Sequence, residues 1–195
     1  MSDVAPVSDD ALDPIEQLAL VYADRQARQA WEALLLLQHR LEDAARPGRE
    51  PLMIQLRLSW WRDRLSEPAG RWPKGEPLLA RMAVWEAEAA ALIDVINGWE
   101  AKVVGEDGGT TLVEAQVAAF EALGRLVGEN DPAAVRTTAE QLVNPAGRHP
   151  SQPRLTRKMR PLSVLAAHAV RSGGAGAARP LFNFGALLRI GLLGR

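Results

Sequence analysis

Two tryptophans and three arginines are concentrated between Gln55 and Leu65, in the segment QLRLSWWRDRL. Guanidinium groups bind phosphate oxygens through paired N–H donors, so Arg57 and Arg62, with Arg28 upstream, are candidate diphosphate ligands. The same side chains can instead form ion pairs with acids close by in the sequence, among them Asp24, Glu32 and Asp63. The residue types leave both interpretations open.

His39, Glu42 and Asp43 form a second group that can do chemistry. Residues spaced i, i+3 and i+4 share one face of a helix, and an imidazole beside two carboxylates can ligate a divalent cation. The alternative is an ordinary solvated helix end, in which the three side chains face water and hold no metal.

Composition limits the classes of function. The chain has 195 residues, no cysteine and a net charge of -1, so neither disulfides nor thiolate metal centres can form, which suits a cytoplasmic protein. Residues 1–140 hold 24 acidic and 14 basic side chains, whereas residues 141–195 hold nine basic and none acidic. The basic residues between 148 and 160 lie in a proline-rich stretch without interleaved aromatics, which argues against a nucleic-acid partner.

The ends of the chain carry different signals. Residues 1–13 contain four aspartates and no basic residue, so we expect a disordered acidic tail and not a targeting peptide. No run approaches the roughly 18 apolar residues of a spanning helix. The remaining residues, 14–195, have the size of one domain with its own core.

Apolar periodicity predicts an all-α protein. The expected helices cover residues 14–45, 51–65, 77–104, 110–128, 132–143, 154–171 and 180–193. Ile54, Leu58, Trp61 and Leu65 should form the buried stripe of the second helix, while Trp60 lies on its flank. A core-facing seam should run along the third helix through Leu78, Met82, Trp85, Ala89, Leu92, Ile96 and Trp99.

Short motifs follow one another in a set order between residues 15 and 128. They are Arg28 with Ala33 and Leu34 (R-x4-A-L), Leu56, Arg57, Trp61 and Arg62 (L-R-x-x-x-W-R), Pro77 followed by Ile93–Ile96, Gly98 and Glu100 (L-I-x-G-x-E), and Leu112–Gly128. Their order and spacing resemble the squalene/phytoene synthase family of prenyl synthases, to which a non-enzymatic respiratory complex I assembly factor is related. The resemblance implies an abbreviated terpenoid-synthase fold.

The acidic motifs of that family are largely missing. In active members, two aspartate-rich helices hold Mg2+ ions that neutralise prenyl diphosphates. The resemblance places the first such motif at the segment LEDAA, where Leu41 and Ala45 replace the outer acids and only Glu42 stays in register. Lys102 stands where an acid often occurs, and the fifth expected helix holds one carboxylate, Glu140. Trp31, Leu41, Ala45 and Trp60 become candidate lining of a lipid cavity, although tryptophans at helical spacing also fit a packed core.

Three functional hypotheses follow. The first is a family member without metal chemistry, a pseudoenzyme that binds a prenyl-like lipid or a protein partner such as a respiratory-complex assembly intermediate. The second is a working Mg2+-dependent prenyl transferase of isoprenoid biosynthesis that uses a reduced metal set of Glu42, Asp43 and Asp94. The third takes Arg179–Arg195, apolar with only basic charges, as a helix that contacts the inner face of a membrane, where closing the core is the alternative.

Overall fold

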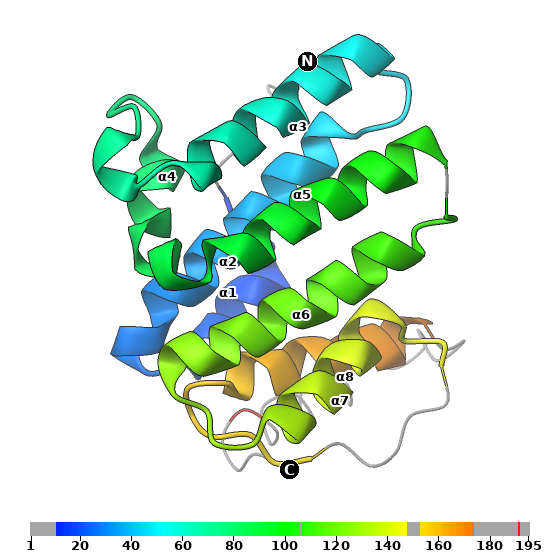
Figure 1. Cartoon of the computed structure of the whole chain (residues 1–195). Coiled ribbons are helices and arrows are strands. Elements are labelled where there is room, and N and C mark those ends of the chain that lie inside the picture. Colours follow the sequence, from blue (N-terminus) through cyan, green and yellow to red (C-terminus); the bar gives the residue numbers. More distant parts are fainter. Residues whose placement is uncertain (1–10, 106, 148–152, 174–190, 192–195) are drawn as a thin grey trace, which may run out of the picture.

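A computed structural model describes residues 11–105, 107–147, 153–173 and 191 (Figure 1). This described part is helical and contains no β-strand, as the sequence predicts. Its α-helices are α1 (Pro14–Val21), α2 (Arg25–Ala44), α3 (Pro51–Ser66), α4 (Pro77–Met82), α5 (Ala89–Val104), α6 (Thr110–Val127), α7 (Pro132–Val143) and α8 (Arg160–Gly173). None of the described helices is both long and apolar enough to cross a membrane.

The predicted continuous helix over residues 14–45 is wrong, because the chain breaks between α1 and α2. The break occurs where the Asp24 side chain accepts a hydrogen bond from the Ala27 N–H at 2.8 Å, which caps α2. The N–H of Tyr22 bonds back to the Ala19 carbonyl and closes the end of α1. Apolar periodicity runs through the turn, so the sequence pattern alone did not reveal the break.

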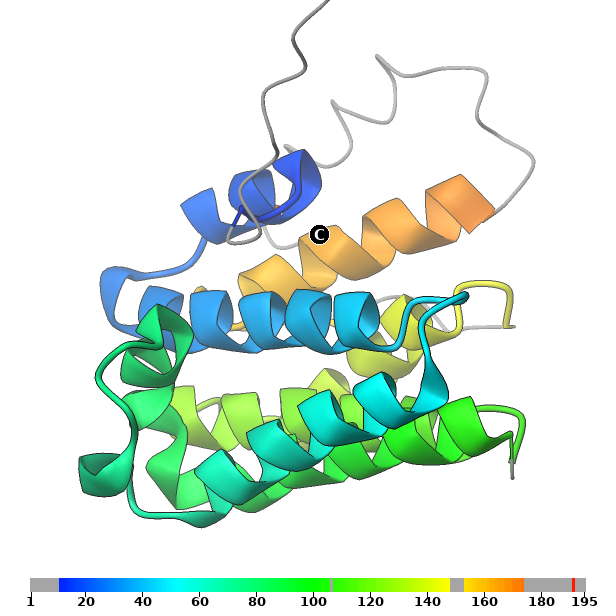
Figure 2. The ribbon, with the colours of Figure 1, turned by 90° about the horizontal axis from the view of Figure 1, so that it is seen from above.

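Helix α2 lies at the centre of the bundle and contacts α1, α3, α4, α5 and α6. Figure 2 shows α1 and α8 on one side of α2, with α3 and α5 on the other. Side chains of α2 point into the core in several directions, and Trp31, Ala33, Leu34, Leu37 and Leu41 are completely buried. Ten of the 20 residues of α2 are buried, and this wide apolar arc contacts helices on several sides.

Helix α3 begins at Pro51, which suits the first helical position because proline lacks an N–H to leave unpaired. Its predicted inner stripe is confirmed, since Ile54, Leu58, Trp61 and Leu65 are all buried. This stripe packs α3 against α5 and, more lightly, against α2.

The predicted helix over residues 77–104 is three pieces in the structure, namely α4, a 3-10 segment Ala83–Glu88 and α5. Gly105 ends α5 in the left-handed conformation, with φ of 79°. The predicted seam is confirmed at Leu78, Met82, Trp85, Leu92, Ile96 and Trp99, which are buried, whereas Ala89 is half-buried.

Helices α6 and α7 follow the predicted ranges. Asp107 caps α6 by accepting hydrogen bonds from the N–H groups of Gly109 and Thr111, at 2.8 and 2.6 Å. Val113 of α6 is 38% exposed. Asp131 caps α7 through the Ala134 N–H, as its place before Pro132 suggests.

The C-terminal part of the chain is described only in places. Helix α8 begins at Arg160, six residues later than predicted, and contacts α1 and α7. The predicted helix over residues 180–193 and most of the predicted acidic tail lie outside the described residues.

Helices α5 and α6 pack most closely at Gly98. A Cβ atom on Gly98 would lie 2.6 Å from the Leu112 Cα, a backbone atom that cannot move without shifting a helix. Glycine is therefore needed here to let the two backbones approach.

We expect Gly98→Ala to lower the free energy of unfolding by about 1–3 kcal/mol, because overpacking exceeds alanine's advantage in helix propensity. Chemical denaturation measures the loss. The matched control is Gly75→Ala, since nothing lies within 4 Å of the Cβ it would add. Equal stability of the two variants would contradict the close α5–α6 contact.

Candidate functional site

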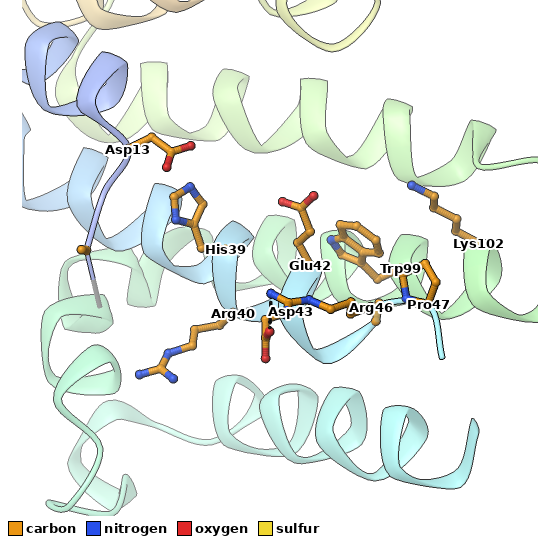
Figure 3. Close-up of a pocket in the computed structure, with 11 residues that line it drawn as sticks. Asp13, His39, Arg40, Glu42, Asp43, Arg46, Pro47, Trp99 and Lys102 are labelled. Atoms are coloured by element: carbon orange, nitrogen blue, oxygen red, sulfur yellow. Dashed lines mark ion pairs between the residues drawn. The ribbon is translucent and has the colours of Figure 1, made fainter. Parts of the chain in front are cut away.

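A hollow of about 560 Å³ lies beside the ends of α2 and α5 (Figure 3). Its lining is mostly charged and comprises Ala11, Asp13, His39, Arg40, Glu42, Asp43, Ala45, Arg46, Pro47, Trp99 and Lys102. The hollow therefore lies beside the last turns of α2, which carry the predicted metal ligands His39, Glu42 and Asp43.

Glu42 and Asp43 point to opposite sides of α2 in Figure 3. Asp43 pairs with Arg46 at 2.9 Å and with Arg49 at 2.7 Å, and its carboxylate lies 3.9 Å from the Arg57 guanidinium. Glu42 has no ion-pair partner among the described residues. The two carboxylates thus do not converge on one point.

His39 is held by α1 and not by its own helix. Its Nε2 atom lies 3.0 Å from the Glu16 carboxylate, and Glu16 also accepts a hydrogen bond from the Asp13 N–H at 2.9 Å. The hydrogen bond to Glu16 raises the pKa of His39 above its ordinary value, burial opposes this, and the charges of Glu16, Asp13 and Glu42 add to the rise. His39 therefore carries its proton to higher pH than a free histidine.

The structure does not bring together the ligand atoms of the predicted metal set, His39, Glu42 and Asp43. Within the described residues, the one group of acids and histidine whose ligand atoms come within 4.8 Å of one another is Asp13, Glu16 and His39. The reason is the break before α2, which folds α1 back along that helix. Asp94, the third member of the reduced transferase set, is exposed on α5 and joins no such group.

Lys102 and Trp99 form the α5 side of the hollow. The Lys102 ammonium lies 4.7 Å from the centroid of the Trp99 ring, a cation–π contact. Trp99 is only 9% exposed, and its indole N–H is buried without an acceptor in the described structure. The position where an acid is expected from the family pattern thus presents a cation.

The three candidate diphosphate arginines lie apart. Arg28 lies near the start of α2 and donates a hydrogen bond to the Leu20 carbonyl at 2.9 Å. Arg57 faces Asp43 near the end of α2. Arg28 and Asp43 are 15 residues apart, which is roughly 22 Å along the helix. Arg62 of α3 forms an ion pair with Glu100 of α5. Arg57 and Arg62 thus pair with acids, as the alternative interpretation expects, but their partners are Asp43 and Glu100 and not Asp24, Glu32 or Asp63.

The predicted cavity lining is also divided. Trp31 and Leu41 are completely buried in the core, Ala45 borders the hollow, and Trp60 is 39% exposed on the outside of α3. The rings of Trp31 and Phe120 pack 5.9 Å apart, and Phe120 also borders a smaller hollow of about 290 Å³.

Sequence reasoning missed Asp13, Glu16 and Trp99 as neighbours of this site. A signal for the first pair was present, because an aspartate at the N-cap with a glutamate three positions later is the pattern of a capping box. The contact between Glu16 of that box and His39 depends on the turn before α2. Residue spacing in the sequence could not predict it.

Comparison with protein-family models, with curated proteins and with solved structures finds no match to this chain.

We expect the Glu16–His39 pair to stabilise the fold in a pH-dependent way. Because the folded-state pKa of His39 is raised, the stabilisation is fully present below the unfolded value of about 6.5 and is lost as pH rises through the higher folded value. His39→Gln should lower the free energy of unfolding by up to about 1 kcal/mol near pH 6 and by less above pH 8, since the pair is partly exposed.

Urea denaturation across about pH 5 to 9 measures this difference. In a Glu16→Gln background, the pH dependence of the His39 substitution should largely disappear. A wild-type advantage that grows with pH would contradict the pairing.

Proposed function

We propose that this chain is a non-catalytic protein with the terpenoid-synthase architecture of squalene/phytoene synthases, and that it acts by binding a protein partner. Contacts between the motifs support the family part of the proposal. Arg62 of the L-R-x-x-x-W-R segment pairs with Glu100 of the L-I-x-G-x-E segment. Gly98 of the same segment lies where the backbones of α5 and α6 approach each other closely.

The residues at the expected acid positions carry the non-catalytic part of the proposal. A prenyl synthase must hold a diphosphate and its metal ions between facing carboxylates, because the leaving charge has to be neutralised. At the two outer acid positions this chain has Leu41, fully buried in the core, and Ala45. Lys102, across the hollow, would repel a divalent cation.

The kind of ligand follows from the same packing. A prenyl chain needs an enclosed apolar slot of several hundred Å³, whereas Trp31 and Phe120 are buried in the core and the hollow that Phe120 borders measures only about 290 Å³. The open hollow is lined mostly by charged residues and suits polar groups better than a lipid tail. A protein surface is therefore favoured over the prenyl-like lipid that is the other candidate.

One observation favours the transferase as a second candidate. Glu42 borders the hollow together with Asp43, and it has no ion-pair partner in the described part of the chain, so it is available to a Mg2+ ion. Asp94 is exposed elsewhere on α5, so this metal set would have to be completed by substrate oxygens or water.

We expect no release of diphosphate when the purified protein is incubated with farnesyl or geranylgeranyl diphosphate and Mg2+. A coupled diphosphate assay compares wild type with Glu42→Ala, and both should equal the protein-free rate. Mg2+-dependent release by wild type that falls about tenfold or more in Glu42→Ala would overturn the proposal and favour the transferase.

A further inference from the structure

Helix α3 has a second apolar face, opposite the one that packs on the bundle. Leu52, Met53, Leu56 and Trp60 are 58, 45, 55 and 39% exposed, respectively. At roughly 100° per residue, these four side chains fall within an arc of about 100° that runs about 12 Å along the helix. We call this set the outer face of α3.

The outer face is fixed in place by the inner stripe. Trp60 packs edge-on against the buried Trp61, with ring centroids 5.0 Å apart and planes at 86°, so its ring is held against a core residue and not free to fold away. Helix α3 lies at the edge of the bundle in Figure 1 and touches the described helices through its other side. A contiguous exposed apolar patch on a rigid helix marks a contact surface.

Arg57 borders this face. Asp43 is the shared partner of Arg46, Arg49 and Arg57, and with the exposed Glu42 and Glu50 the charges of residues 42–57 balance. Arg57 is itself half-exposed and follows Leu56 in the sequence of α3. Arg57 comes one turn after Met53 and so lies beside the stripe, while the exposed Asp63 lies at its far end.

We propose that the outer face of α3 docks on an anionic phospholipid surface, with its leucines and Trp60 at the level of the headgroups and Arg57 against the phosphates. An apolar helix face with arginine beside it and tryptophan at its edge combines the two attractions that peripheral membrane binding requires. A stable protein interface buries about 800 Å² on each partner, whereas four half-buried side chains offer on the order of a few hundred. The proposal goes beyond the proposed function and does not depend on it.

Flotation of the full chain with vesicles tests the proposal. Vesicles of phosphatidylcholine with phosphatidylglycerol should carry the protein upward, and vesicles of phosphatidylcholine alone should carry much less. The double variant Leu52→Ser/Leu56→Ser should bind anionic vesicles about tenfold or more weakly, because two apolar anchors are lost. Arg57→Gln should weaken binding, and raising the salt from about 0.1 M to about 1 M should do the same to wild type.

The control variant is Val21→Ser, which removes an equally exposed apolar side chain at the end of α1, away from the outer face, and should bind like wild type. Circular dichroism confirms that each variant is folded. Binding that survives the α3 double variant but is lost in Leu188→Ser would assign the membrane contact to residues 179–195 and overturn the proposal.

A protein interface is the remaining outcome. Size-exclusion chromatography with light scattering would then show a wild-type dimer that the α3 double variant lacks, with no flotation of either protein. That result would also overturn the proposal. Neither result bears on diphosphate release, so the membrane proposal and the non-catalytic proposal can fail separately.

Discussion

Two buried tryptophans hold the bundle together around neighbouring residues of α2. Trp31 donates its indole N–H to the Lys158 carbonyl at 2.9 Å, which ties α2 to the segment before α8. Trp85 donates to the Ala30 carbonyl at the same distance, which ties the 3-10 segment to the adjacent turn of α2. Burying an indole N–H without an acceptor would destabilise the fold. These two hydrogen bonds therefore fix the positions of the segment before α8 and of the 3-10 segment relative to α2. The remaining helices pack around this junction.

The parts of the fold that depend on local chemistry were predictable. The inner stripe of α3 follows from a run of apolar residues at helical spacing, and Pro51, Pro77 and Pro132 each start a helix because proline fits its first turn. The break before α2 was not predictable from periodicity, since Leu18 and Tyr22 continue the apolar pattern. At this point the chain can either continue as one helix or start a new helix capped by Asp24, and tertiary packing favours the new helix.

The sequence indicated which stretch of α2 borders the candidate site, but not which residues its side chains contact. Spacing places Glu42 and Asp43 on α2, and both border the hollow, but adjacent helical residues are about 100° apart, so only Asp43 turns to three arginines. His39 finds its carboxylate on a different helix, 23 residues earlier in the chain. Pairing between distant segments depends on how helices cross, which a residue spacing within one helix cannot reveal.

The contact between α1 and α8 sets an order for folding. Helices α5, α6 and α7 each touch the next helix along the chain, the first two across loops of 5 and 4 residues and the third across residues 144–159. The contact between α1 and α8 joins segments about 140 residues apart, and closing so long a loop costs entropy that must be paid before the contact forms. We therefore expect a nucleus in the second half of the molecule, with α1 joining last. Because local contacts dominate, the chain should fold quickly for its length.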